Sequence, residues 1–242
     1  MKKLLATAAL ALLPVLGFAN TGGPALQQSN IDLRDQASLQ RGAKYYMSYC
    51  SGCHSLQYMR YNRMAADIGI SDTDLRKYFL VGDAKPGDLI KRSMTDADAQ
   101  KWFGVASPDL TLVARWRTPD WIYTYLKSFY LDPTRAYGVN NVLFPNVAMP
   151  NVLGDLGGDQ EAVMSHHAGS TPVAEGVKPI KPGSLPPAQY DAMIRDITAF
   201  LAYVGEPIQQ ERKRLGAYVL VFLGFFFVIA YLMKKEYWKD VH

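Results

Sequence analysis

The chain has 242 residues, of which 49% are hydrophobic and 20% are charged, and this composition suits one globular domain with additional segments. Its 26 lysines and arginines face 22 acidic residues, and two of those lysines lie in a segment expected to be removed. The remaining charge is nearly balanced and shows no concentrated basic cluster, which argues against a nucleic-acid-binding protein.

The N-terminus has the pattern of a secretory signal peptide. Two lysines precede an apolar run from Leu4 to Leu16, and Gly17-Phe18-Ala19 then places small residues at the positions that a signal peptidase reads. We therefore expect residues 1–19 to be a signal peptide and residues 20–210 to form an exported domain. A retained N-terminal anchor is the alternative, and the cleavage site that follows the short run disfavours it.

The chain's two cysteines follow a helical pattern. Residues 20 to about 35 predict a loosely held arm, after which Leu39, Ala43, Tyr46 and Cys50 recur on one helical face. The helix leads into Cys50-Ser51-Gly52-Cys53-His54, and this Cys-x-x-Cys-His spacing indicates haem attached through two thioethers, with His54 bound to the iron. Gly42, on the same helix, is a candidate for close approach to another helix.

Two other roles for the cysteines are less favoured. A structural disulfide across two intervening residues closes almost no loop and would restrain the unfolded chain little. A thioredoxin-like thiol pair is expected at a strand-to-helix junction within a βαβ unit, and the flanking sequence has no such pattern. Covalent haem attachment therefore explains the motif best.

The middle of the chain predicts little regular structure. Asp67 to Asp98 is rich in aspartate and predicts surface loops with short helices, whereas Trp121 to Tyr130 is aromatic and predicts a helix covering one side of the haem pocket. Residues 150–187 are rich in glycine and proline and predict a long loop. Its acidic part, Asp155 to Glu175, is a candidate for steering a basic partner.

A second protein ligand on the iron would close it to small molecules and make an electron carrier. Met149 is the best candidate, because it lies in an apolar loop, Phe144 to Pro150, whose prolines reduce the entropy lost on ordering. A neutral thioether in an apolar wall also suits a haem of high potential.

The other candidates for this position are weaker. Met64, Met94 and Met193 are interpreted as core methionines, and His242 lies beyond the expected membrane span. His166 and His167 remain an alternative, although their glycine-rich acidic surroundings indicate a solvated surface.

The C-terminal part predicts two consecutive helices. A helical stripe of apolar residues begins after Pro186 and Pro187 and ends at Gly205. It is formed by Tyr190, Met193, Ile194, Ile197, Leu201 and Val204. Nineteen uncharged residues follow from Leu215 to Met233, long enough as a helix to cross a hydrocarbon core of about 30 Å.

We therefore expect a transmembrane helix at residues 211–234 and a cytoplasmic tail at residues 235–242. A buried core helix is disfavoured because the run has no polar face. Basic residues flank it almost equally, so the charge pattern alone does not orient it. The export signal does, and it predicts a single-pass protein of the cytoplasmic membrane with the haem domain on the periplasmic side.

Several of these motifs together resemble the cytochrome c1 family of the cytochrome bc1 complex, ubiquinol–cytochrome c reductase. The resemblance is carried by the haem motif, the segment from Ser107 to Arg117 (SPDLTLVARWR), the Ala148-Met149-Pro150 loop and the single C-terminal anchor, and it extends from about Leu39 to the end. It implies a mainly α-helical fold, a class I cytochrome c-like haem domain with long loops plus one C-terminal transmembrane helix.

The resemblance also implies roles for residues and partners. It makes Cys50 and Cys53 the attachment points of one haem c, with His54 and Met149 as axial ligands; Pro108 would line the pocket and Arg117 would neutralise a haem propionate. Cytochrome b and the Rieske iron–sulfur protein would be partner subunits, the latter as electron donor, and a cytochrome c would accept the electron. The isolated chain would then be an electron carrier and not an enzyme.

Three rival functions remain open from the sequence. An anchored cytochrome that serves a different oxidase or reductase shares every haem feature and differs in its partners. A haem peroxidase or gas sensor would keep an open iron site. A membrane-tethered thiol oxidoreductase would carry no porphyrin.

Overall fold

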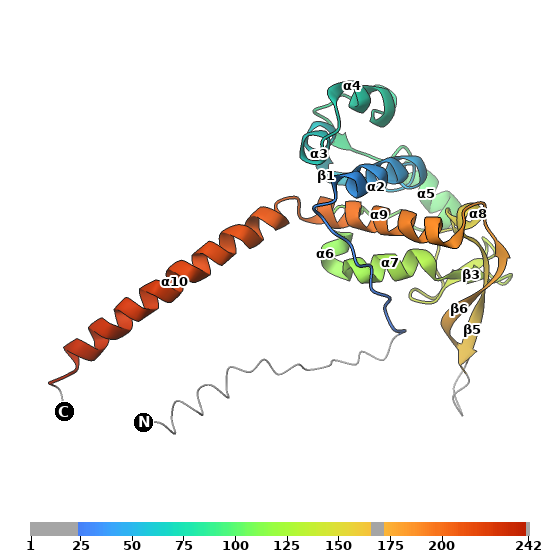
Figure 1. The fold of residues 1–242 in the computed structure, drawn as a ribbon. Coiled ribbons are helices and arrows are strands. Elements are labelled where there is room, and N and C mark those ends of the chain that lie inside the picture. Colours follow the sequence, from blue (N-terminus) through green and yellow to red (C-terminus); the bar gives the residue numbers. More distant parts are fainter. Residues whose placement is uncertain (1–23, 166–171, 241–242) are drawn as a thin grey trace.

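The computed structural model describes residues 24–165 and 172–240, and it shows a mainly helical domain from which one long helix projects (Figure 1). The helices of the domain are α2 (Gln36–Tyr49), α3 (Tyr61–Ile68), α4 (Asp72–Asp74), a π-helical turn (Leu75–Phe79), α5 (Asp96–Phe103), α6 (Val113–Arg117), α7 (Pro119–Lys127), α8 (Gly154–Gly157) and α9 (Pro187–Gly205). The strands form antiparallel pairs: β1 (Leu56–Arg60) with β2 (Leu89–Ile90), β3 (Phe129–Leu131) with β4 (Val139–Asn141), and β5 (Gly158–Ser165) with β6 (Val173–Pro182). The projecting helix is α10 (Gln209–Tyr237).

Some expectations concern residues outside this described part of the chain. They are the signal peptide at residues 1–19, the two alternative iron ligands His166 and His167, and the terminal His242.

The centre of the domain is the crossing of α2 over α9. A side-chain carbon on Gly42 would lie 2.1 Å from the carbonyl oxygen of Asp196, so the two helices can approach this closely only at a glycine. Asp196 is buried, and its carboxylate accepts hydrogen bonds from Arg41 at 2.7 Å and from Ser38 at 2.6 Å. The close approach expected at Gly42 is therefore confirmed, and an ion pair reinforces it.

Helix α9 matches the predicted apolar stripe. It begins at Pro187, where a missing N–H costs nothing, and it ends at Gly205. Met64 and Met193 belong to the hydrophobic core as expected, with 0% and 3% of their surfaces exposed. Met94 does not, because it lies half-buried at the edge of the haem motif, where its backbone N–H donates to the carbonyl of Gly52.

The aspartate-rich segment from Asp67 to Asp98 contains the expected short helices but is not only surface. Leu75 and Ile90 are each 1% exposed and belong to the core, and Ile90 lies on β2, which pairs with β1. The sequence did not indicate these positions because the segment is rich in aspartate and its apolar residues follow no helical or alternating pattern.

The prediction of a long loop at residues 150–187 is wrong. After α8, strands β5 and β6 pair from Gly158–Pro182 to Ser165–Val173, forming an extended antiparallel arm (Figure 1). Most of their side chains are exposed or half-buried, so the alternation of apolar and polar residues that marks a half-buried strand is weak. The side chain of Gln160 ties the arm to the domain by donating to the carbonyls of Lys127 and Phe129.

Lysines on β6 offset part of the acidic charge on β5. Glu161 lies 3.3 Å from Lys178 and Asp159 lies 3.9 Å from Lys181. The acidic segment proposed to steer a basic partner is therefore partly neutralised within the hairpin.

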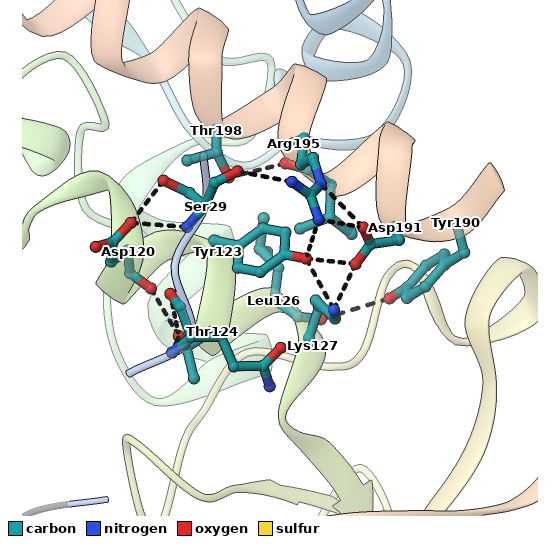
Figure 2. Close-up of polar contacts among 12 residues, drawn as sticks. Ser29, Asp120, Tyr123, Thr124, Leu126, Lys127, Tyr190, Asp191, Arg195 and Thr198 are labelled. Carbon is teal, nitrogen blue, oxygen red and sulfur yellow. Dashed lines mark hydrogen bonds and ion pairs between the residues drawn. The ribbon is translucent and has the colours of Figure 1, made fainter. Parts of the chain in front are cut away.

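The described part of the predicted N-terminal arm, residues 24–35, is not loosely held. It lies against α7, where the N–H of Gln27 donates to the Thr124 hydroxyl at 2.9 Å, and Ser29 is 3% exposed. Its N–H and hydroxyl donate to Asp120 at 2.8 and 2.6 Å, and its carbonyl accepts from Arg195 on α9 (Figure 2). The sequence did not predict this docking because the partner side chains lie about 90 or more positions away along the chain.

A partly exposed polar cluster joins α7 to α9 beside this arm (Figure 2). Asp191 accepts hydrogen bonds from Lys127, Tyr123 and Arg195. Burial alone would raise the pKa of Asp191, but these hydrogen bonds and the Lys127 charge lower it to about 2. Helix α7 is thereby fixed to α9; it ends at Lys127, short of the predicted Tyr130, because the chain turns into β3.

Helix α10 is long and apolar enough to cross a membrane, and its apolar stretch is not covered by the rest of the structure. Glu206 sits at its junction with α9 and pairs with Arg115 of α6 at 2.8 Å and with Arg212 of α10. These ion pairs attach the first turn of α10 to the domain.

Candidate haem c site

The Cys-x-x-Cys-His motif forms compact turns at the end of α2. The carbonyl of Cys50 accepts the N–H groups of Cys53 at 3.1 Å and His54 at 2.9 Å. Tyr46, which is fully buried, donates its hydroxyl to the carbonyl of His54 at 2.6 Å. The local turns place the two cysteines and the histidine together, and Tyr46 fixes the end of the motif to the core.

The imidazole of His54 is oriented by a segment far away in the sequence. Its Nδ1 lies 2.7 Å from the carbonyl oxygen of Pro108, and because a carbonyl only accepts, Nδ1 carries the proton. Burial lowers the pKa of His54, although the Pro108 hydrogen bond and Asp109 act in the opposite direction. The ring is therefore neutral and its Nε2 has a free lone pair, the form that binds a metal.

Arg92 holds the segment that orients His54, and nothing in the sequence marked it. Its side chain is 16% exposed and donates to the carbonyls of Met94 at 3.0 Å and Ser107 at 2.5 Å. Its backbone N–H donates to the hydroxyl of Ser55, directly after the motif. Arg92 thus connects the haem motif to the residue that precedes Pro108.

An apolar hollow brings the predicted cofactor residues together. Cys50, Cys53, His54, Pro108 and Met149 all line it. Its remaining walls are mostly apolar and come from Tyr49, Phe103, Val105, Ser107, Ala148, Pro150 and Val152. Of the predicted site residues, only Arg117 lies outside this lining.

The Met149 side of the hollow is backed by aromatic residues of α7. The hydroxyl of Tyr125 lies 3.5 Å from Met149 Sδ, and Trp121 stacks on the Tyr125 ring with centroids 4.9 Å apart. The guanidinium of Arg117 lies 4.9 Å from the centre of the Trp121 ring and 4.0 Å from that of Trp116. Within the described residues, Arg117 forms no ion pair with a carboxylate, so its charge is available to a partner outside the chain.

The donor set fits haem c better than it fits a redox thiol pair. Burial, followed by the nearby Cys53, raises the pKa of the Cys50 thiol to about 12, whereas a reactive thiol needs a lowered pKa. The two cysteines are not joined in a disulfide. In residues 24–165 and 172–240 no group of three or more His, Cys, Asp or Glu side chains could hold a bare metal ion.

Comparison with known proteins agrees with this donor set. The model of the Cytochrome C1 family matches residues 27–241. The chain belongs to the cytochrome c1 family. A cytochrome c1 from Allochromatium vinosum is 66% identical over the whole of both chains.

Less similar relatives cover the chain almost as completely. Cytochrome c1 from Rhodobacter capsulatus is 30% identical and covers 98% of this chain and 97% of its own. A relative from Nitrosomonas europaea named ammonia monooxygenase gamma subunit is 40% identical, covering 97% of this chain and 96% of its own.

Membership of the family has direct consequences. The chain is a haem c-binding electron-transfer subunit of a bc1 complex, and Cys50 and Cys53 fit its Cys-x-x-Cys-His attachment site. Helix α10 is a single-pass membrane anchor. The mainly helical fold with one C-terminal transmembrane helix is confirmed.

Proposed function

We propose that one haem c is attached to Cys50 and Cys53 and that its iron is bound by His54 Nε2 and Met149 Sδ. The observation that carries this proposal is the arrangement of His54. Its Nδ1 is occupied by the Pro108 carbonyl, its Nε2 is free, and the same apolar hollow contains Met149. A sulfur ligand in an apolar wall favours a high reduction potential.

When bound, the haem supplies reversible one-electron chemistry. The chain's own residues would position it and exclude water from it, and with His54 and Met149 both bound the iron would offer no open site to a substrate. In this proposal the isolated chain is an electron carrier, and turnover of quinol belongs to the complete reductase.

Pro108 and Arg117 have distinct roles in this proposal. Pro108 orients His54 through its carbonyl and lines the hollow. Arg117 pairs with a haem propionate, since a guanidinium matches a carboxylate in shape and charge and this one has no such partner within the described chain. Arg117→Gln should lower the midpoint potential because a positive charge near the haem is lost. Arg115→Gln, which removes a residue paired with Glu206, should leave the potential unchanged.

The proposed partners are those that the family resemblance implies. The Rieske iron–sulfur protein is the electron donor, cytochrome b is the neighbouring membrane subunit, and a cytochrome c is the acceptor. The support is the match to the Cytochrome C1 family over residues 27–241 and the similarity to named cytochromes c1. Co-purification of the tagged full chain with a multi-span cytochrome b supports this assembly, whereas association with a terminal oxidase alone contradicts it.

The haem domain lies on the periplasmic side of the cytoplasmic membrane in this proposal, with residues 1–19 as the signal peptide and residues 211–234 as the span. The export signal supports this orientation. A tag at the C-terminus should be protected from protease in intact spheroplasts and cleaved only after the membrane is permeabilised. Cleavage in intact spheroplasts would show the opposite orientation.

The visible spectrum of the purified full-length protein tests the ligand assignment. We expect haem that stays attached under denaturing conditions, a sulfur-to-iron charge-transfer band in the ferric form, and no rapid binding of carbon monoxide in the ferrous form. Met149→His should remove the charge-transfer band but keep the covalent haem. Met164→His, on the β5 strand, is the control and should keep the band. A band that survives in Met149→His would overturn the assignment of Met149.

A further inference from the structure

Two adjacent buried asparagines shape the loop that carries Met149. Asn140 and Asn141 end β4, and 7% and 0% of their surfaces are exposed. The strand β4 pairs with β3, which follows α7 directly. The side chain of Asn141 lies between α7, which backs the haem hollow, and the loop that leads to Met149, whereas that of Asn140 lies between the β3–β4 turn and the same loop.

The side chain of Asn141 joins that loop to α7. Its Oδ1 accepts the N–H groups of Leu143 at 2.9 Å and Phe144 at 3.3 Å. Its Nδ2 donates to the carbonyl of Tyr125 at 2.9 Å. Tyr125 is the residue whose hydroxyl approaches Met149 Sδ, so the loop and its contact partner are held by one amide.

The side chain of Asn140 holds the next part of the loop. Its Oδ1 accepts the N–H of Asn146 at 2.8 Å, and its Nδ2 donates to Asp132 at 3.0 Å. Asn146 has a φ of +63°, a backbone conformation that few side chains adopt without strain. The hydrogen bond from its N–H therefore helps to hold a conformation that the chain would not favour by itself.

Only an amide side chain satisfies both requirements at these positions. Each asparagine provides an acceptor for loop N–H groups and a donor for a fixed acceptor elsewhere. Aspartate would offer no donor and would bury a charge, and an apolar residue would leave the loop N–H groups and the Tyr125 carbonyl without these partners.

We infer that Asn140 and Asn141 are positioning residues for the sixth iron ligand. They hold the loop of residues 143–146 so that Met149 Sδ stays beside the Tyr125 hydroxyl and is not displaced by other ligands. This inference rests on the proposed function, in which Met149 binds the iron. Because Met149 has no covalent bond to the haem, its occupancy depends on the free energy with which the loop keeps one conformation.

The test uses the full-length holoprotein in detergent with the variants Asn140→Ala and Asn141→Ala. We expect both to retain covalent haem and helical content. Their charge-transfer band should weaken, and the affinity of the ferric haem for added imidazole should rise at least tenfold, because the methionine is more easily displaced. Asn62→Ala, at an exposed position on α3, should match the wild type.

Further variants separate this role from general destabilisation. Ser38→Ala removes a hydrogen bond at the α2–α9 crossing, so it weakens the fold away from the loop and should leave the imidazole affinity unchanged. If Asn141→Ala yields no holoprotein, Asn140→Ala decides the question. Wild-type band intensity and imidazole affinity in the asparagine variants that fold would overturn the inference. Met149→His distinguishes that outcome from failure of the proposed function, which predicts loss of the band in that variant.

Discussion

The two walls of the haem site differ in how their residues are fixed. On the motif side, Cys50, Cys53 and His54 are held by turns within five residues, and the thioethers of a bound haem would hold them further. On the methionine side, Met149 lies in a loop whose shape depends on Asn140, Asn141 and the helix α7. The first wall is defined by local chemistry and the second by packing.

The residues that identify an iron ligand in the sequence are therefore different from the residues that orient it in the structure. The spacing of the cysteines and histidine identifies the site, but the orientation of the His54 ring depends on Pro108 and Arg92. A methionine without a covalent restraint needs more of such support, and the structure supplies it through buried amides. Four substitutions test this division, from the largest expected effect to the smallest.

The helix crossing that carries the motif should be the most sensitive point. Gly42→Ala would place a carbon 2.1 Å from the Asp196 carbonyl, so α2 and α9 must separate. We expect the free energy of unfolding of the haem domain to fall by about 3 kcal/mol. Urea unfolding followed by haem absorbance measures it. Gly87→Ala, where the added carbon meets nothing within 4 Å, is the control, and equal midpoints for the two variants would contradict the prediction.

The support of His54 should be the next most sensitive point. Arg92→Met leaves the carbonyls of Met94 and Ser107 without their donor, and we expect a loss of about 2 kcal/mol in the same unfolding experiment. Lys91→Met changes the exposed neighbouring residue and should have almost no effect. A midpoint for Arg92→Met within error of Lys91→Met would show that this connection does not stabilise the motif side.

The stability that Asp191 contributes by attaching α7 to α9 should depend on pH. Helix α7 backs the Met149 side of the hollow. The folded-state pKa of Asp191 is about 2, below the value of about 3.9 usual for aspartate. Its contribution is therefore present above about pH 4 and is lost as the pH falls towards 2. Asp191→Asn should lower the thermal stability at pH 6, by roughly 1 to 2 kcal/mol after allowance for solvent screening, and the difference from wild type should shrink below pH 4.

Thermal unfolding followed by circular dichroism between pH 6 and pH 2.5 measures this difference. Asp72→Asn, which removes an exposed ion pair with Arg76, is the control and should show little difference at any pH. A difference between Asp191→Asn and wild type that stays constant to pH 2.5 would contradict the assigned pKa.

The smallest effect is expected in the ligand loop itself. At Asn146 the backbone has a φ of +63°, which asparagine tolerates better than alanine because its short polar side chain can form local hydrogen bonds. We expect Asn146→Ala to lower the free energy of unfolding by about 1 kcal/mol. Asn146→Gly should be close to neutral because glycine accepts this conformation. The unfolding midpoint and the charge-transfer band should move together in Asn146→Ala. Equal stability of the two variants would show that backbone strain plays no part in holding the loop.

Much of the site could be predicted because each of its signals is contained in a short stretch of sequence. The haem motif occupies five residues, Met149 stands in a short proline-bounded loop, and the structure places them around one hollow. The apolar stripe from Tyr190 to Val204 predicted α9 for the same reason, since burial of one helical face repeats every three or four residues.

The sequence by itself determined the haem motif, the main helices and the membrane anchor, because covalent spacing and apolar periodicity are properties of neighbouring residues. Only the tertiary structure decided the β5–β6 hairpin, the docking of Ser29, the orientation of His54 and the shape of the Met149 loop. These features depend on polar groups whose partners lie on other segments. A hydrogen-bonding side chain carries no mark of its partner, so its role becomes visible only when folding brings the two together.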